Sequence, residues 1–302
     1  MHKRLAIGLL AACLGAGHAW ASDARMTDLS ERAVALALEE NPLLGYLSGL
    51  PMSDHSRWPD RSAEAISRIQ AREDALLAEL RRLEQDDVTQ AATKLDHALL
   101  TERLEANTGL RVCRHELWDV NHMSGWQMML PEMAKQQPVG TAAEREQALQ
   151  RWAVLPAYID REIANLRAGL QAGYSSPKSV VKRVSGQIDG LAKAAPDKSP
   201  LAEPATRADD AAFAQAFRKL IAEQVNPALP RSRAFLDADY LPKAREPLAI
   251  TANPQGEACY EASLRAYTTL NRSAQQVHDL GAATVAANLA GIQDMGERLY
   301  GT

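Results

Sequence analysis

The chain has 302 residues, a length that allows one large domain or two ordinary ones. Hydrophobic residues make up 46% and charged residues 24%, as in a globular protein with a substantial core. The net charge of −4 gives no electrostatic reason to bind nucleic acid or an anionic membrane. Alanine and leucine are abundant and aromatic residues make up only 5%, so the composition favours an all-α fold.

The N-terminus has the pattern of an export signal. The basic start MHKR precedes the apolar run LAIGLLAACLGAG, and HAWA supplies the small-x-small pattern that signal peptidase recognises. We therefore predict a signal peptide over residues 1–21, with cleavage after Ala21, and one helical domain over residues 22–302. The location implied is periplasmic or secreted.

The same residues permit a second interpretation. LAAC matches a lipoprotein cleavage box, which would make Cys13 the lipidated residue. Under the first interpretation, loss of Lys3 and Arg4 changes the net charge to −6. No segment of the sequence is long and apolar enough to span a bilayer, so no membrane span is expected.

The region up to residue 110 contains strong helical patterns. Residues 27–40 read as a helix, and residues 41–60, rich in glycine, proline and serine, as an extended surface segment. Residues 62–84 place isoleucines and leucines on one helical face, and a second apolar helix follows the break at residues 86–87. The pair predicts an antiparallel helical hairpin.

Later helices are marked by caps and prolines. Capping boxes at Thr141 and Ser273 open two of them, and Pro156 is expected to begin a new helix. Residues 193–206 read as a linker or surface loop, and the four prolines of residues 226–247 predict interrupted helices. Residues 248–254, LAITANP, are the one fair strand candidate.

Two cysteines, Cys113 and Cys259, remain after the predicted cleavage. In an oxidising compartment they are expected to form one disulfide, and the alternative is two separate buried thiols. A disulfide here would close a loop of about 145 residues and strongly constrain the unfolded chain.

Residues 113–127, CRHELWDVNHMSGWQ, invite comparison with the zinc motif H-E-x-x-H. Asp119 stands where the second histidine should be, and His122 lies two helical turns from His115, too far to share one zinc ion with it. The other catalytic signatures, G-x-S-x-G, the P-loop and G-x-G-x-x-G, are also missing. We therefore assign no catalytic residue and no metal ligand.

Several segments together resemble a known family. They are KLDHALLTERLE, VCRHELWDVNHMSGWQMMLP, residues 137–184, YLPKARE, and NPQGEACYEASLRAYTTLNRSAQQVHDLG. In order and spacing they are similar to the exported proteins that carry domain of unknown function 885. The last segment, with its Tyr-x-x-x-Leu-Arg-x-Tyr-Thr-Thr run, is the most specific.

The resemblance implies a helical fold related to zinc peptidases of the carboxypeptidase Taq type. Family members are roughly twice as long, and their zinc motif H-E-x-x-P-G-H-H lies downstream of the matched region. This sequence lacks that motif. It is therefore expected to correspond to the N-terminal part of such a protein, as a truncated product, a fragment or a member without the catalytic half. No cofactor is expected in this chain, and zinc is expected only in a full-length relative.

The resemblance also suggests five residues that would line a peptide cleft in a complete protein: Trp126, Gln127, Tyr260, Arg265 and Tyr267. An arginine and tyrosine hydroxyls can hold a peptide carboxylate or a developing oxyanion. The alternative interpretation places the tyrosines and Trp126 in the core and makes Arg265 a structural ion-pair partner.

Two functions follow from these patterns. The first is the non-catalytic part of a peptidase-like protein whose complete form takes peptide substrates, with this chain inactive alone. The second is a non-catalytic helical scaffold or a module that binds peptides or proteins. The sequence predicts no oligomeric state.

Overall fold

The predicted all-α class is confirmed. The computed structural model describes residues 3–195 and 198–301, with side chains from residue 21 onward except that of residue 86. Within these ranges there is no β-strand, only an isolated parallel bridge between Pro177 and Arg245. The helices are α1 (Lys3–Glu40), α2 (Leu44–Ser48), α3 (Ala63–Leu80), α4 (Ala91–Leu110), α5 (Trp126–Gln136), α6 (Ala142–Gln171), α7 (Lys178–Ala192), α8 (Glu203–Arg207), α9 (Ala211–Leu220), α10 (Asn226–Phe235), α11 (Gly256–Thr268) and α12 (Ala274–Tyr300).

Shorter turns join these helices. The 3₁₀ turns are η1 (Gln85–Asp87), η2 (Arg111–Cys113), η3 (His115–Leu117), η4 (Pro200–Ala202), η7 (Leu241–Lys243) and η8 (Ile250–Ala252), and the π turns are η5 (Ile221–Val225) and η6 (Leu236–Tyr240). None of the described helices combines the length and the apolar character that crossing a bilayer requires.

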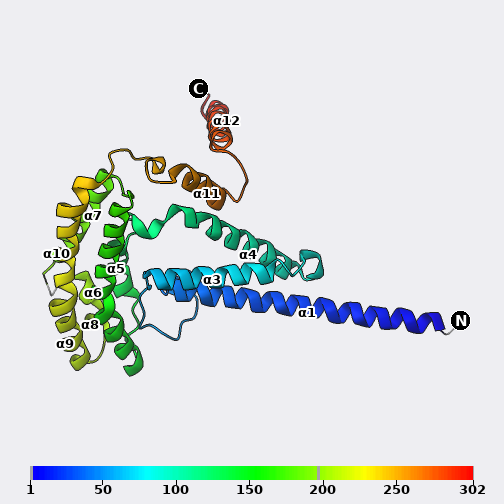
Figure 1. Ribbon diagram of the computed structural model, residues 1–302, viewed down its shortest axis with the longest axis horizontal. Helices are drawn as coiled ribbons and strands as arrows, with labels where there is room; N and C mark the ends of the chain where they lie inside the picture. The colour runs from blue at the N-terminus through cyan, green and yellow to red at the C-terminus, as the bar shows by residue number, and fades with distance from the viewer. Residues whose placement is uncertain (1–2, 196–197, 302) are drawn as a thin grey trace.

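One hydrophobic core joins α1, α3 and α4, which lie side by side (Figure 1). The predicted hairpin is α3 followed by α4, with Leu80 and Val88 fully buried near the connection. Asp23 of α1 fixes the start of α4, because its carboxylate accepts hydrogen bonds from Thr89 and from the Thr93 hydroxyl at 2.7 Å. These bonds hold the pKa of Asp23 well below its usual range.

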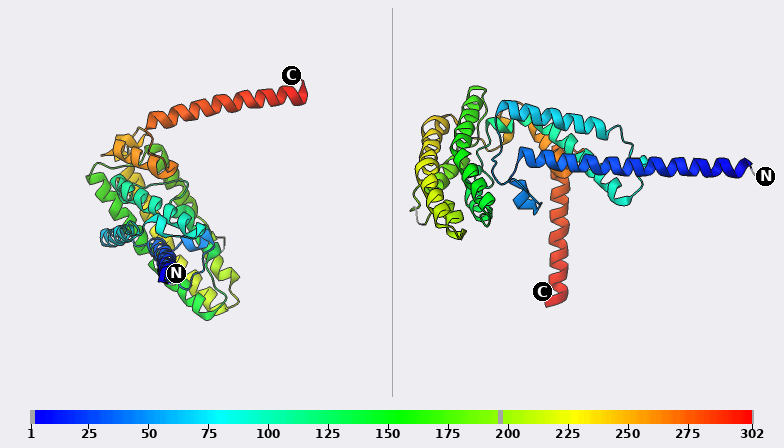
Figure 2. Two further views of the ribbon diagram at one scale, coloured as in Figure 1. Left: turned by 90° about the vertical axis from the view of Figure 1, so that its right-hand side faces the viewer. Right: turned by 90° about the horizontal axis from the view of Figure 1, so that it is seen from below.

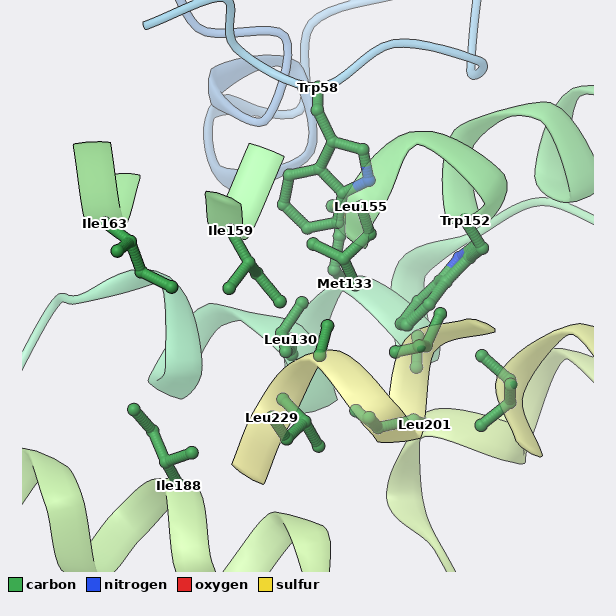
Figure 3. Packing of buried hydrophobic residues seen from close by; sticks show 14 of the residues in the cluster. Trp58, Leu130, Met133, Trp152, Leu155, Ile159, Ile163, Ile188, Leu201 and Leu229 are labelled. Carbon is green, nitrogen blue, oxygen red and sulfur yellow. The ribbon is translucent and has the colours of Figure 1, made fainter. Parts of the chain in front are cut away.

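A second, larger core lies among α5 to α10 (Figure 1). Trp152 of α6 is fully buried and packs edge-on against Phe217 of α9, with ring centroids 5.7 Å apart. Trp58 reaches the same core from the segment between α2 and α3, close to Trp152 and Leu155 (Figure 3). The expectation of an extended surface segment over residues 41–60 is thus wrong in part, because this segment contains α2 and buries Trp58.

Pro156 does not begin a new helix, contrary to the sequence expectation, and lies inside the continuous helix α6. A proline here lacks the N–H that would bond to the carbonyl of Trp152. The helix persists because Trp152, Leu155 and Ile159 on both sides of the proline are fully buried. Burial of this face outweighs the lost hydrogen bond.

The prolines of residues 226–247 also interrupt the helices less than expected. From Ala211 to Lys243 the chain runs through α9, η5, α10, η6 and η7 without an extended residue. Pro227 and Pro242 each follow a π turn and occupy the first turn of the next element, where a missing N–H costs little. The strand candidate LAITANP instead contains the 3₁₀ turn η8, so that expectation was wrong.

The C-terminal helix α12 projects away from the rest of the molecule in every view (Figures 1 and 2). Both predicted capping boxes are present, at Thr141 of α6 and at Ser273 of α12. Helix α12 has no buried residue, and Leu289 and Ile292 are 61% and 67% exposed. Its apolar stripe therefore has no partner among the described residues.

The burial pattern predicts that Leu155 contributes far more than Leu289 to the free energy of unfolding. Leu155→Ala should lower the free energy of unfolding by about 2–5 kcal/mol, because it leaves a cavity in the larger core. Leu289→Ala should change it by less than about 0.5 kcal/mol, because that side chain is exposed on α12. Urea denaturation followed by circular dichroism measures both, and a similar loss in the two variants would contradict the packing described.

Candidate functional site

The segment that follows α4 is held against α6 by one close contact. A Cβ atom on Gly169 would lie 1.7 Å from the carbonyl oxygen of Leu117, so only glycine lets η3 approach α6 this closely. Arg114, between η2 and η3, has a left-handed backbone with φ of 48°. This path brings residues 115–119 close to Tyr158 and Glu162 of α6.

Four side chains from three segments form what we call the acid–arginine cluster. They are Arg61, which precedes α3, Asp119, which follows η3, and Tyr158 and Glu162 of α6. The Arg61 Nε atom lies 3.5 Å from Glu162 Oε1, an ion pair without hydrogen-bond geometry. A guanidinium held by one long contact keeps donors free for another acceptor.

The surroundings of this cluster disfavour negative charge. Burial raises the pKa of Glu162 and of Asp119, and the Arg61 guanidinium partly opposes both shifts. Burial also raises the pKa of the Tyr158 hydroxyl. Asp119 is exposed whereas Glu162 is half-buried, so burial acts more strongly on the Glu162 carboxylate. Two carboxylates with raised pKa values beside an arginine are typical of functional sites.

Members of the cluster line two separate cavities. A polar cavity of about 270 Å³ is lined by Arg61, His115, Glu40, Glu73 and Arg103, among others. A small cavity of about 20 Å³ is lined by Asp119 and Glu162 together with Trp126 and Gln127. The cluster thus has solvent-accessible space on one side and a narrow hollow on the other.

Trp126 and Gln127, two of the predicted cleft residues, therefore lie beside the acidic members of the cluster. Gln127 is 2% exposed, and its amide donates hydrogen bonds to Asn121 O at 2.7 Å and to Gln187 Oε1 at 3.0 Å. Trp126 is half-buried at the start of α5 and packs against the larger core. Both are positioned at the edge of the small cavity.

The other three predicted cleft residues lie on α11 and line neither cavity. Arg265 forms a two-pronged ion pair with Glu102 of α4, which raises the pKa of Arg265 and lowers that of Glu102. Tyr260 and Tyr267 are 42% and 88% exposed. A substrate-cleft role for these three residues stays a prediction.

The predicted disulfide between Cys113 and Cys259 is present. Both cysteines are 2% exposed, and the bond links η2 to α11. Together with the pair between Arg265 and Glu102, it attaches α11 to the end of α4.

The described residues do not fit the zinc that the family resemblance implies. Their one group of three potential ligands is Cys113, His115 and Cys259. Two of these ligands are joined in the disulfide and offer no thiolate. No catalytic step through zinc can therefore be assigned to this chain.

Sequence reasoning did not single out Arg61, Tyr158 or Glu162. One signal was available, because Glu162 stands next to Ile159, Ile163 and Leu166, the apolar stripe of α6. A carboxylate at the border of such a stripe is expected to have low solvation. Arg61 carried no comparable signal, because nothing in the sequence around it indicates that it reaches α6.

The comparisons with known proteins agree with this fold. Residues 42–302 match the model of the family described as bacterial protein of unknown function, DUF885. The chain belongs to this family. A search of curated proteins finds no match.

A solved structure shares the fold of this DUF885 chain. It is described as the crystal structure of "the putative lipoprotein from Colwellia psychrerythraea", with a TM-score of 0.76 and 15% sequence identity. The match covers 93% of the present chain and 52% of the solved chain. The DUF885 chain thus spans about half the length of this similar structure.

The disulfide should stabilise the fold measurably. Reduction should lower the free energy of unfolding by about 2–5 kcal/mol, because the bond closes a very long loop in the unfolded chain. Urea denaturation with and without reductant measures the change. A variant with both Cys113→Ser and Cys259→Ser is the control, and reductant should not change its free energy of unfolding. An equally unchanged free energy of unfolding in the wild-type chain would contradict the prediction.

The arginine of the cluster should control the ionisation of Glu162. Arg61→Met should raise the pKa of Glu162 further, because the guanidinium now lowers it. Carbon-13 NMR of the labelled carboxyl group over a pH series gives this pKa directly. Arg57→Met, which removes an exposed arginine paired with Asp54, is the matched control and should leave Glu162 unchanged. A fall in the pKa of Glu162 in Arg61→Met would refute this account.

Proposed function

We propose that this chain is the peptide-binding, non-catalytic part of an exported protein that resembles zinc-dependent peptidases, and that it hydrolyses no peptide alone. The observation that carries the proposal is the position of Arg61, which lies 3.5 Å from Glu162, lowers the raised pKa of Asp119 and lines the polar cavity. Its guanidinium has donors available for a peptide carboxylate or carbonyl oxygen.

The polar cavity has the mixed charge that a peptide terminus requires. Arg61 and Arg103 offer positive charge for a carboxylate, and Glu40 offers a carboxylate for an ammonium group. Arg111 is already held by Asp74 at 2.8 Å and by Glu73 at 3.0 Å, so we assign it a structural role. A volume of about 270 Å³ is near the lower end for ligand pockets, which favours a short peptide or a chain end.

The proposal assigns no chemistry to the cluster alone. Burial raises the pKa of both Asp119 and Glu162, the direction that favours proton transfer near neutral pH, but activation of water in zinc peptidases also requires a metal ion. The described residues do not provide that ion with a ligand set. Binding and positioning of a peptide is the role that these side chains support.

Export is the second part of the proposal. The signal-like residues 1–21 and the disulfide both support an oxidising compartment. The description of the similar solved structure as a lipoprotein supports the alternative in which Cys13 is lipidated. The side chain of Cys13 lies outside the described residues.

The test uses the purified chain and short peptides in free-acid and C-terminally amidated forms. Isothermal titration should detect binding of the free acid, weakened at least about tenfold by amidation and by Arg61→Met, since hydrogen bonds between charged groups contribute about 1.5–3 kcal/mol. Arg57→Met should bind like the wild type. Equal binding by Arg61→Met, or hydrolysis that a chelator abolishes, would overturn the proposal.

A helical scaffold or protein-binding module is the second candidate. The exposed apolar stripe of α12 favours it, and so does an apolar groove of about 350 Å³ between α1, α2 and α4. Under this alternative no short peptide binds, and charge introduced at Leu289 and Ile292 abolishes association with a protein partner. The peptide titration therefore separates the two functions.

A further inference from the structure

Three potential metal ligands converge where η2, η3 and α11 meet. The Sγ atoms of Cys113 and Cys259 and a ring nitrogen of His115 all lie within 4.8 Å of one another. Among the described side chains, which begin at residue 21, this is the one such group of three histidine, cysteine or acidic residues. Cys113 and His115 stand on successive 3₁₀ turns, separated only by the left-handed Arg114.

We propose that reduction of the disulfide turns this group into a zinc-binding site. A dithiol reductant gives up two electrons and two protons and becomes a disulfide, while Cys113 and Cys259 become free thiols. Zinc then displaces the two thiol protons to solvent and binds the two thiolates and the His115 imidazole. The site shares His115 with the polar cavity but uses no member of the acid–arginine cluster, so it needs no part of the proposed function.

The ligand set and the distances suit zinc. Thiolate and imidazole are its preferred ligands, at about 2.3 Å and about 2.0–2.1 Å from the metal, so two ligand atoms of one ion lie roughly 3.5 Å apart. A group within 4.8 Å needs only separation of the two sulfurs and side-chain adjustment to reach that spacing. Two thiolates also neutralise the charge of Zn²⁺, so little net charge is placed beside the buried cysteines.

The site would have three protein ligands and one open position. His115 also lines the polar cavity of about 270 Å³, so water can reach the metal from that side. Three ligands with a fourth held by water are typical of exchangeable rather than closed structural zinc sites.

Zinc would also maintain the attachment of α11 in the reduced chain. The two cysteines belong to η2 and α11, so a metal between them links the same elements as the disulfide. A chain that meets reductant and zinc together would keep this link, whereas one that meets reductant alone would depend on the Arg265–Glu102 pair.

The test titrates Co²⁺, as a spectroscopic substitute for Zn²⁺, into the full chain reduced by a phosphine without oxygen. We expect one equivalent to bind with the strong near-ultraviolet absorption of a cobalt thiolate, and Zn²⁺ to remove that absorption. The oxidised chain and the Cys259→Ser variant should lack it. His115→Ala should weaken binding by about tenfold or more, since even outer-shell partners of metal sites contribute that much.

His122→Ala is the matched control, because His122 lies outside the group and contacts Arg183. It should bind cobalt like the wild type. Absence of the thiolate band in the reduced wild-type chain, or unchanged affinity in His115→Ala, would overturn the site. Circular dichroism measures whether reduction alone lowers the helix content. If it does, zinc should restore the lost helicity of the reduced chain. Failure to restore it counts against the proposal.

Discussion

The close contact between Leu117 and Gly169 connects the two parts of this molecule. On one side of it α1, α3 and α4 share a core, and on the other α5 to α10 share a larger one. Because η3 lies directly on α6, the loop that follows places Asp119 near Glu162 and Tyr158. A side chain at position 169 would separate these elements and move Asp119 away from Glu162.

The site combines residues that are far apart in the sequence. Arg61 comes from the segment that crosses between the cores, Asp119 from the loop after η3, and Glu162 from α6. Each carboxylate is partly desolvated, and the arginine offsets only part of that cost. Structural ion pairs are usually closer and better hydrogen-bonded, as the Arg265–Glu102 pair is. This contrast supports the proposal that Arg61 binds a ligand, whereas the Arg265–Glu102 pair has the geometry of a structural ion pair.

Sequence patterns predicted the helical class, the α3–α4 hairpin, both capping boxes and the disulfide. These features depend on local spacing or, for the disulfide, on there being only two candidates. The patterns failed where tertiary packing overrides a local rule, as at Pro156, which α6 tolerates because its neighbours are buried. Of the residues at the candidate site, only Trp126 and Gln127 were predicted from the sequence. No local pattern indicates that Arg61 and Glu162 lie close together in the fold.

The disulfide has a consequence for how the chain matures. Its two cysteines flank α5 to α10, so in the native fold the bond joins η2 to α11 across the whole of the larger core. Residues 22–302 contain no other cysteine, and therefore no wrong intramolecular pair can form. Oxidative folding of this region needs an oxidant but no isomerase to correct mispaired intermediates. Maturation of this region thus depends on meeting an oxidant once and not on sorting among alternative cysteine pairs.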